Sequence, residues 1–191
     1  MLNLIAFHSV SPGHGKSSLA RALSDEIPGS QIWNFAGPAR LMLTSLLSQR
    51  GFTHFEIYRY LHEIKDEPIP GMYGETGRSL LKSLASGWGR GMVNPCIWAD
   101  TLEQNVATYL RDGRTVIMDD LRFQEEVPFI RREKGVIIKV TRPGAPAPPT
   151  DGHESEGNPI PYDFEYHNTR SPEEGARFLK ELILTYLEIC K

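Results

Sequence analysis

The chain contains 191 residues, a length that suits one α/β domain with a buried sheet. Hydrophobic residues make up 40% of it and charged residues 24%, the formal net charge is −3, and the pI is near 6.1. This balance lacks the basic footprint of a protein that binds duplex nucleic acid. No apolar run approaches the roughly 18 residues that a membrane-spanning helix needs, so no membrane partner is expected.

The amino terminus reads Met-Leu-Asn-Leu-Ile and has neither the basic segment nor the small-residue cleavage site of a secretory signal. We therefore expect a cytoplasmic location. The two cysteines, Cys96 and Cys190, lie far apart and lack the spacing of zinc or redox pairs. Both are expected to be plain thiols.

The first predicted elements are a strand and a helix joined by a short loop. Residues 2–8 form an apolar run bounded by a Ser/Pro/Gly cluster, which is typical of a buried parallel strand. Leu19, Ala20, Leu23 and Ile27 recur at helical spacing, and the pattern ends at a Pro-Gly pair. The loop between strand and helix is rich in glycine.

The rest of the chain alternates in the same way. Strands are predicted at residues 31–35, 115–118 and 136–140. Helices are predicted at residues 38–51, 53–65, 77–87, 96–111 and 124–134, and a capping box at Ser171 to Glu174 opens a final helix. This order predicts a three-layer α/β fold with a parallel core sheet that binds ligands at the carboxyl ends of its strands.

One segment does not fit either pattern. Residues 143–161 contain six prolines, three glycines and several acidic residues, which is too polar and too broken for a core element. Its length allows it to close over a ligand, so we predict that it is a lid.

The loop after the first strand has the composition of a phosphate-binding loop. Its residues are Gly13, His14, Gly15, Lys16, Ser17 and Ser18. Glycines let backbone N–H groups turn toward a polyphosphate, and the start of the following helix adds positive potential. We predict that these residues bind ATP, that Lys16 reaches the β and γ oxygens, and that Ser17 binds Mg²⁺. Val10 stands where the motif usually has its first glycine.

Two carboxylates follow the predicted strand at residues 115–118. Asp119 and Asp120 resemble the second acidic element of P-loop enzymes, in which a carboxylate coordinates Mg²⁺ directly or through water. We assign the metal role to Asp120, with Asp119 as the second candidate. The alternative is that one of them caps the next helix.

Phosphoryl transfer also needs cations, and the planar fork of arginine suits phosphate oxygens. The candidates are Arg40, Arg78, Arg90, Arg122 and Arg142. Each of them alone is more often a solvated surface residue, but their positions at element ends favour a phosphate role for Arg78, Arg122 and Arg142.

Several separated segments resemble those of bacteriophage deoxynucleoside monophosphate kinases, in the same order and over nearly the whole chain. These segments are residues 13–18, Phe35 to Arg40, Arg78 and Leu84, Trp88 to Arg90, Pro95 to Trp98, Asp120 to Phe123 with Glu126, Arg142 to Gly144 with Asp151 to Glu156, and Asn168. The resemblance implies the fold of P-loop nucleoside monophosphate kinases in a single domain, residues 1–191. Within it, the monophosphate-binding region covers about residues 36–98 and the lid about residues 143–161.

The resemblance also implies roles for individual residues. The catalytic set is Lys16, Asp120, Arg122 and Arg142, and Arg142 and Asn168 join the loop in binding ATP. The expected substrate contacts are Arg40, Arg78, Ser86, Trp88, Arg90, Trp98, Arg122 and Glu126. The expected lid residues are Asp151, His153, Ser155 and Glu156. The chain departs from the family pattern at Ala85-Ser86-Gly87, where an acidic residue is common.

The function expected from these features is ATP- and Mg²⁺-dependent phosphorylation of a deoxynucleoside monophosphate to the diphosphate, in the host cytoplasm if the chain is phage-encoded. One alternative is a related kinase that acts on a modified base or another hydroxyl acceptor. Another is a nucleotide-binding switch that performs no transfer. The sequence leaves open the accepted base, the sugar preference and whether the chain forms a homodimer.

Overall fold

The structure is a computed structural model and describes residues 4–11, 13–145 and 159–189. It divides into two compact units. The sheet unit comprises Met1–Phe35 and Leu102–Lys191, and the helical unit is Ala36–Thr101.

The sheet unit contains every strand of the described chain. The strands are β1 (Leu4–His8), β2 (Gln31–Trp33), β3 (Val116–Leu121), β4 (Val136–Thr141) and β5 (Phe164–His167). They form one parallel sheet in the order β2-β3-β1-β4-β5. Because β1 lies between β3 and β4, the chain builds the sheet outward on both sides of it, and ligands bind such sheets at the carboxyl ends near this switch point.

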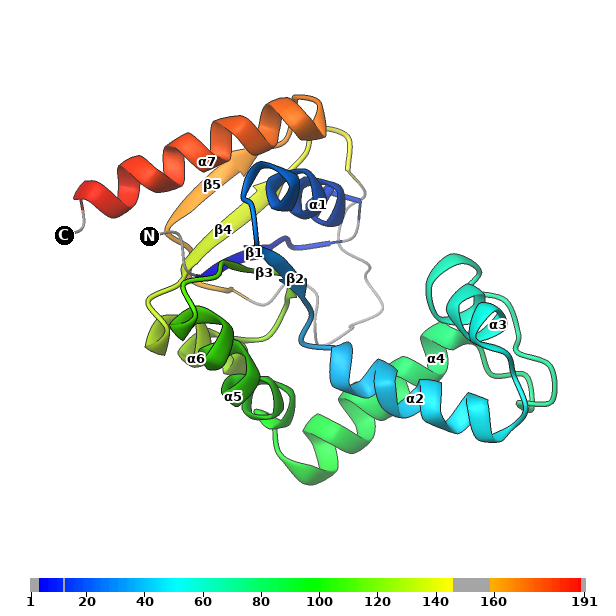
Figure 1. The fold of residues 1–191 in the computed structure, drawn as a ribbon. Coiled ribbons are helices and arrows are strands. Elements are labelled where there is room, and N and C mark those ends of the chain that lie inside the picture. The colour runs from blue at the N-terminus through cyan, green and yellow to red at the C-terminus, as the bar shows by residue number, and fades with distance from the viewer. Residues whose placement is uncertain (1–3, 12, 146–158, 190–191) are drawn as a thin grey trace. The chain divides into compact units, whose positions relative to one another are not determined.

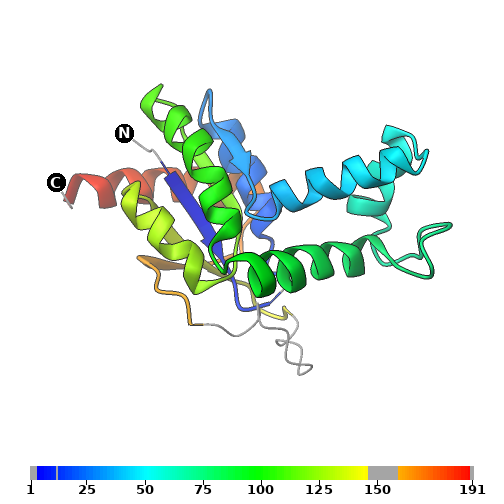
Figure 2. The same cartoon turned by 90° about the horizontal axis from the view of Figure 1, so that it is seen from below.

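Helices cover both faces of this sheet (Figures 1 and 2). One face carries α1 (Lys16–Glu26) and α7 (Pro172–Ile189). The other face carries α6 (Val127–Arg132), which follows the short helix η3 (Gln124–Glu126), and the part of α5 (Ile97–Arg111) that belongs to the sheet unit. The result is a three-layer α/β arrangement.

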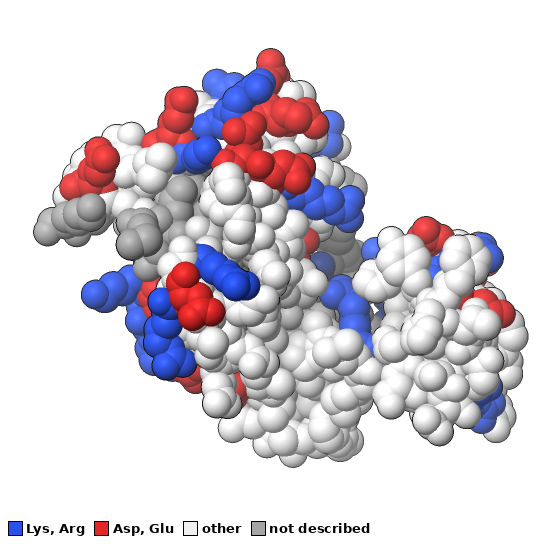
Figure 3. Space-filling view, viewed as in Figure 1, with Lys and Arg blue, Asp and Glu red and all other residues white. Residues whose placement is uncertain are grey.

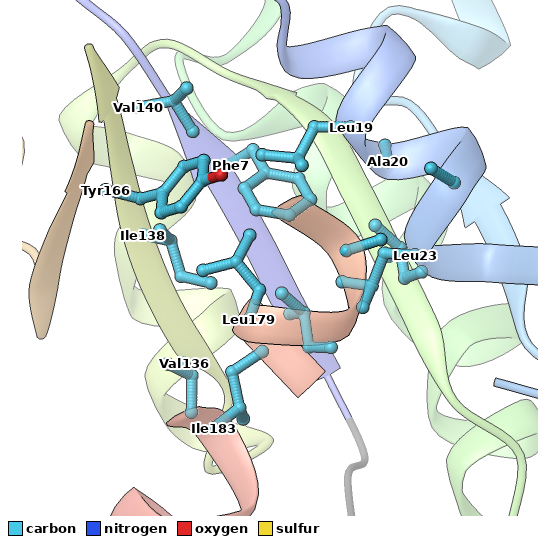
Figure 4. Close-up of a cluster of buried hydrophobic side chains, with 14 of the residues drawn as sticks. Phe7, Leu19, Ala20, Leu23, Val136, Ile138, Val140, Tyr166, Leu179 and Ile183 are labelled. Atoms are coloured by element: carbon cyan, nitrogen blue, oxygen red, sulfur yellow. The ribbon is translucent and has the colours of Figure 1, made fainter. Parts of the chain in front are cut away.

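The main core lies between the sheet and the helices α1 and α7 (Figure 4). Alternate residues of β1 and β4 point into it, so Phe7 and Ile138 meet Leu23 of α1 and Leu179 of α7. All four side chains are excluded from solvent. Burial of one such side chain stabilises the fold by about 1.5–3 kcal/mol.

The helical unit has a core of its own. It contains α2 (Gly37–Gln49), α3 (His54–Tyr58), η1 (Arg59–Glu63), α4 (Gly77–Lys82) and η2 (Ser83–Val93). The residues buried together are Leu43, Leu47, Ile57, Leu61 and Ile69. Capping boxes at Thr53 and Thr76 begin α3 and α4.

The predicted three-layer fold is confirmed, but three details differ. The strand β5 was not predicted. The strand β3 runs on to Leu121, so the two aspartates lie within it and not beyond its end. The predicted helices at 53–65 and 77–87 both change into π-helical segments, η1 and η2, and η2 continues to Val93. Residues 146–158 of the predicted lid lie outside the described residues.

The surface in Figure 3 shows acidic and basic side chains side by side over the helices at the top of the view. The exposed side of α7 contributes Glu173, Glu174, Arg177 and Glu181 to this mixture. Such mixed charges are typical of a solvated helix surface. In the described part of the chain, no helix has both the length and the apolar character to cross a membrane.

One polar atom in the main core has no partner. The hydroxyl of Tyr166 is buried and makes no hydrogen bond within the described structure. It packs against Gly175, where an added Cβ atom would lie 2.5 Å from the hydroxyl oxygen.

We therefore predict that Tyr166→Phe raises the free energy of unfolding by about 1 kcal/mol. Folding removes the hydrogen bonds between this hydroxyl and water, and no hydrogen bond within the described structure replaces them. Urea denaturation followed by circular dichroism measures this change. Tyr186→Phe is the matched control, since that hydroxyl donates to Asp163 at 3.2 Å and its loss should destabilise the fold. A destabilised Tyr166→Phe variant would contradict the prediction.

Candidate active site

The loop between β1 and α1 has the backbone of an anion-binding site. Gly13 and Gly15 have φ angles of 88° and 82°, a left-handed conformation that glycine adopts without strain. Gly15 is the N-cap of α1, so no side chain caps the first N–H groups of the helix, and the first turn contains no acidic residue. Backbone donors at the start of a helix and its dipole both favour a bound phosphate.

The side chains at the start of α1 fit the same ligand. Ser17 and Ser18 are exposed, and Lys16 is half-buried. The ammonium group of Lys16 donates to the hydroxyl of Ser9, which itself donates to the carbonyl of Ser11 at 2.7 Å. The lysine therefore lies across its own loop, next to the backbone donors.

His14 lies inside the loop and is 7% exposed. Its Nε2 atom is 2.9 Å from the hydroxyl oxygen of Ser11, and its Nδ1 atom accepts a hydrogen bond of 3.0 Å from the backbone N–H of Arg142. Burial lowers the pKa of His14 below its ordinary value of 6.5, and the positive charge of Lys16 acts in the same direction. A neutral ring thus joins the loop to the end of β4.

Asn168, just after β5, holds the loop from another side. Its amide group donates to the carbonyl of His14 at 2.9 Å, and its backbone N–H donates to the carbonyl of Thr141 at 2.7 Å. A Cβ atom on Gly15 would lie 2.5 Å from the Asn168 amide nitrogen. A side chain at position 15 would therefore strain the backbone and displace this amide from His14.

The two aspartates of β3 point toward the segment that follows β2. Asp119 accepts a hydrogen bond from the side-chain amide of Asn34, and Asp120 accepts one of 2.8 Å from the backbone N–H of Phe35. Both side chains are half-buried. In these positions they connect the carboxyl ends of β2 and β3, and neither serves as the N-cap of η3, which is Phe123.

Arg122 and Glu126 follow directly after β3. The carboxylate of Glu126 is buried, at 1% exposure, and accepts hydrogen bonds from the backbone N–H groups of Arg122 at 2.9 Å and Phe123 at 3.2 Å. The contacts of Glu126, which was predicted to touch substrate, are thus those of a residue that holds the backbone of Arg122.

Sequence reasoning missed His8, the last residue of β1. Its ring is 3% exposed, and Nδ1 is 3.4 Å from the carbonyl oxygen of Leu121 at the end of β3. Burial lowers the pKa of His8 to about 4, the hydrogen bond to Leu121 opposes this shift, and the charges of Lys16, Lys139 and Arg122 add to it. The alternation along β1 was the available signal, because it places His8 on the face opposite Phe7.

The predicted substrate contacts, apart from Arg122 and Glu126, belong to the helical unit. Arg78 forms a two-pronged ion pair with Asp66, with Nη2 3.0 Å from Oδ2, and this hydrogen bond lowers the pKa of Asp66. Arg40 is half-buried in α2. Arg90 donates to the carbonyl of Pro95 at 3.3 Å.

The two tryptophans of this unit differ in exposure. Trp98 is 2% exposed and donates from its indole nitrogen to the carbonyl of Ala85 at 2.8 Å, which gives it the contacts of a packing residue. Trp88 is 42% exposed, with its ring centroid 6.4 Å from that of Trp98. Ser86 precedes Trp88 by two positions and is half-buried.

The described residues of the sheet unit thus join three predicted segments: the loop, Arg142 and Asn168. Asp120 and Arg122 extend this edge along β3. The lid residues Asp151, His153, Ser155 and Glu156 lie outside the described residues.

No family profile matches the chain. A protein of Acanthamoeba polyphaga mimivirus, provisionally named a deoxynucleotide monophosphate kinase, is 27% identical over 172 residues, which cover 85% of this chain and 86% of that protein. This relative comes from a virus of an amoeba and not from a bacteriophage.

Two solved structures of APS kinase CysC from Mycobacterium tuberculosis have a similar fold. The complex with AMPPNP and APS has a TM-score of 0.52 at 13% identity, and a cysteine-to-alanine mutant has a TM-score of 0.50 at 12% identity. Each likeness covers 95% of this chain and 96% of the other. The chain therefore shares the α/β fold of these two kinase structures.

The low pKa of His8 has a consequence for stability. An unfolded chain protonates this ring below about pH 6.5, whereas the folded chain resists protonation until about pH 4. The stability present above pH 6.5 is therefore lost as the pH falls toward 4. We expect this group to lower the free energy of unfolding by about 2 kcal/mol between pH 7.5 and pH 5.

Urea denaturation of the wild type and His8→Gln at both pH values measures this contribution. The glutamine amide does not titrate and can still donate to Leu121, so the variant should lose less stability in acid. His14 titrates in both proteins and cancels in the comparison. Equal losses in the two proteins would show that His8 is not the group responsible.

Two glycines of η2 test how closely Trp98 packs against this helix. A Cβ atom on Gly89 would lie 2.3 Å from Cζ2 of Trp98, while nothing lies within 4 Å of a Cβ atom on Gly87. We predict that Gly89→Ala lowers the free energy of unfolding by about 1–3 kcal/mol through overpacking, and that Gly87→Ala does not. Near-ultraviolet circular dichroism should report a displaced indole in the first variant alone. Equal stability of the two variants would mean that Trp98 is not wedged against this helix.

Proposed function

We propose that the chain transfers the γ-phosphoryl group of ATP to a deoxynucleoside monophosphate and forms the diphosphate. The observation that carries this proposal is the loop before α1. Two left-handed glycines, an uncapped helix start without acidic residues, and Lys16 converge at the end of the central strand. A polyphosphate is the ligand that such a set of donors and charges favours.

The acceptor class rests on different support. The mimivirus relative carries the name of a deoxynucleotide monophosphate kinase. The sequence resemblance to deoxynucleoside monophosphate kinases includes the region between β2 and α5, where Arg40, Arg78, Trp88 and Arg90 lie. Arginines suit the phosphate of such an acceptor, and an exposed indole suits a base.

The chemistry needs little from the protein beyond position and charge. An oxygen of the acceptor phosphate attacks the γ-phosphorus, the bond from the γ-phosphorus to the bridging oxygen breaks, and ADP leaves with that oxygen. The acceptor oxygen is already anionic, so no general base is required. Lys16, Arg122 and Arg142 would offset the charge that builds up during transfer.

Magnesium would fit the same edge of the sheet. The hydroxyl of Ser17 is exposed in the first turn of α1, and Asp120 supplies a carboxylate from β3, both of them hard oxygen donors of the kind that Mg²⁺ prefers. When bound with ATP, the ion would screen the charges of the β- and γ-phosphates. The hydrogen bond from Phe35 to Asp120 would keep that carboxylate in one orientation.

Two alternatives remain distinct from this proposal. A kinase for a modified base would transfer phosphate to an oligonucleotide, and a nucleotide switch would bind or hydrolyse ATP without forming a new phosphate ester or anhydride. By resemblance, some arginines are assigned to ATP and others to the acceptor. This distribution favours phosphoryl transfer over a nucleotide switch.

The test is a panel of deoxynucleoside and ribonucleoside monophosphates incubated with ATP, Mg²⁺ and the chain, with products separated by anion-exchange chromatography. We expect a deoxynucleoside diphosphate and an equal amount of ADP. Lys16→Ala should lower kcat/KM by about a hundredfold or more while the melting temperature stays close to that of the wild type, since the lysine charge acts mainly in the transition state.

An oligonucleotide with a hydroxymethylated base and a reaction without acceptor complete the panel. Phosphorylation of the oligonucleotide alone would replace the proposed acceptor. ADP formation at the same rate with and without an acceptor would favour a nucleotide switch. Near-normal turnover in Lys16→Ala would contradict the proposed role of the loop in phosphoryl transfer.

A further inference from the structure

The ring of His14 connects the phosphate loop to the residue that follows β4. Both ring nitrogens have partners, Arg142 N–H at 3.0 Å on Nδ1 and the Ser11 hydroxyl at 2.9 Å on Nε2. The side chain is 7% exposed, so these contacts are sheltered from water. Histidine at this place does more than fill a turn between two glycines.

The partners determine which nitrogen carries the hydrogen. The backbone N–H of Arg142 can only donate, so Nδ1 must accept and carry no proton. The neutral ring then has its hydrogen on Nε2 and donates to Ser11. The two bonds therefore select one tautomer, with the hydrogen on Nε2. They also fix the orientation of the ring between the loop and the backbone of Arg142.

The backbone on either side of Arg142 is held in different ways. Thr141 still belongs to β4, where it pairs with His167 of β5, and its carbonyl accepts from the backbone of Asn168 at 2.7 Å. Beyond Thr141 the strand ends, and the first N–H group outside the ladder is the one that His14 accepts. The ring thus sets where the backbone of Arg142 leaves the sheet.

We propose that His14 is a positioning residue that orients Arg142 toward the phosphates held by its own loop. The inference rests on the proposed function, because Arg142 is the cation assigned to the transferred group. His14 itself acts through Arg142 and need not touch the nucleotide. A displacement of about 1 Å at such a cation can cost about a hundredfold in rate.

Two substitutions distinguish the roles of the two ring nitrogens. Asparagine places an oxygen where Nδ1 lies, so His14→Asn keeps an acceptor for Arg142 and loses the donor to Ser11. Glutamine is one carbon longer and reaches the place of Nε2, so His14→Gln keeps the contact with Ser11 and loses the acceptor for Arg142. The proposal predicts that the glutamine variant is the more damaged of the two.

The first measurement needs no nucleotide. Amide hydrogen exchange at Arg142, followed by nuclear magnetic resonance, should be faster in His14→Gln than in His14→Asn. Melting temperatures of both variants identify any general loss of folding. Equal exchange at Arg142 in two folded variants would overturn the proposed contact.

The second measurement is turnover with the best monophosphate. His14→Gln should lower kcat about ten- to a hundredfold, with the KM for ATP changed less than kcat, and His14→Asn should lose less. In an Arg142→Ala background, His14→Gln should cost little further, because the residue that it positions is gone. A full loss that persists without the Arg142 side chain would overturn the positioning role.

The two measurements also keep the proposals apart. A chain that phosphorylates no monophosphate overturns the proposed function, whereas the exchange rates at Arg142 still decide whether His14 holds that backbone.

Discussion

The contact between Gly15 and the amide of Asn168 is the constraint on which the candidate site depends. It brings the phosphate loop against the chain that follows β5, and a Cβ atom at position 15 would displace this amide. The same amide donates to the carbonyl of His14, whose ring accepts from Arg142. The ends of β1, β4 and β5 are therefore tied together by hydrogen bonds before any nucleotide binds, which is the preorganisation that transition-state charge requires.

The two faces of the sheet bury different kinds of side chain. Phe7 and its neighbours on β1 and β4 fill the core beneath α1 and α7, where the buried side chains are apolar apart from the Tyr166 hydroxyl. One residue later, His8 lies on the other face, and its ring contacts the end of β3 while three cations act on its pKa. A neutral, buried imidazole adds nothing to the repulsion among these cations, whereas a protonated ring would add to it, which is one reason why the pKa of His8 is lowered.

Local patterns were enough to predict the elements that local chemistry determines. The loop was recognisable because Gly13, Gly15 and Lys16 follow an apolar run and precede a helical period. The end of β3 was misplaced because its pairing with β1 continues past a register shift to Leu121 and so includes the two aspartates, a tertiary effect that their polarity conceals. The strand β5 was missed because four residues after a proline-rich segment become a strand only by pairing with β4. The contact from His14 to Arg142 spans 128 positions, and no spacing rule reports it.

The helical unit contains the residues predicted to bind the acceptor, and it has a hydrophobic core of its own. Trp98 is wedged against Gly89 and fixed to Ala85, so the π-helical segment η2 has one side that permits no added atom. Gly87, two residues earlier, has open space where a side chain would start. This chain departs from its resembled family at that open position and keeps the closed one. A side chain can therefore be added at Gly87 without meeting Trp98, whereas one added at Gly89 would displace the indole.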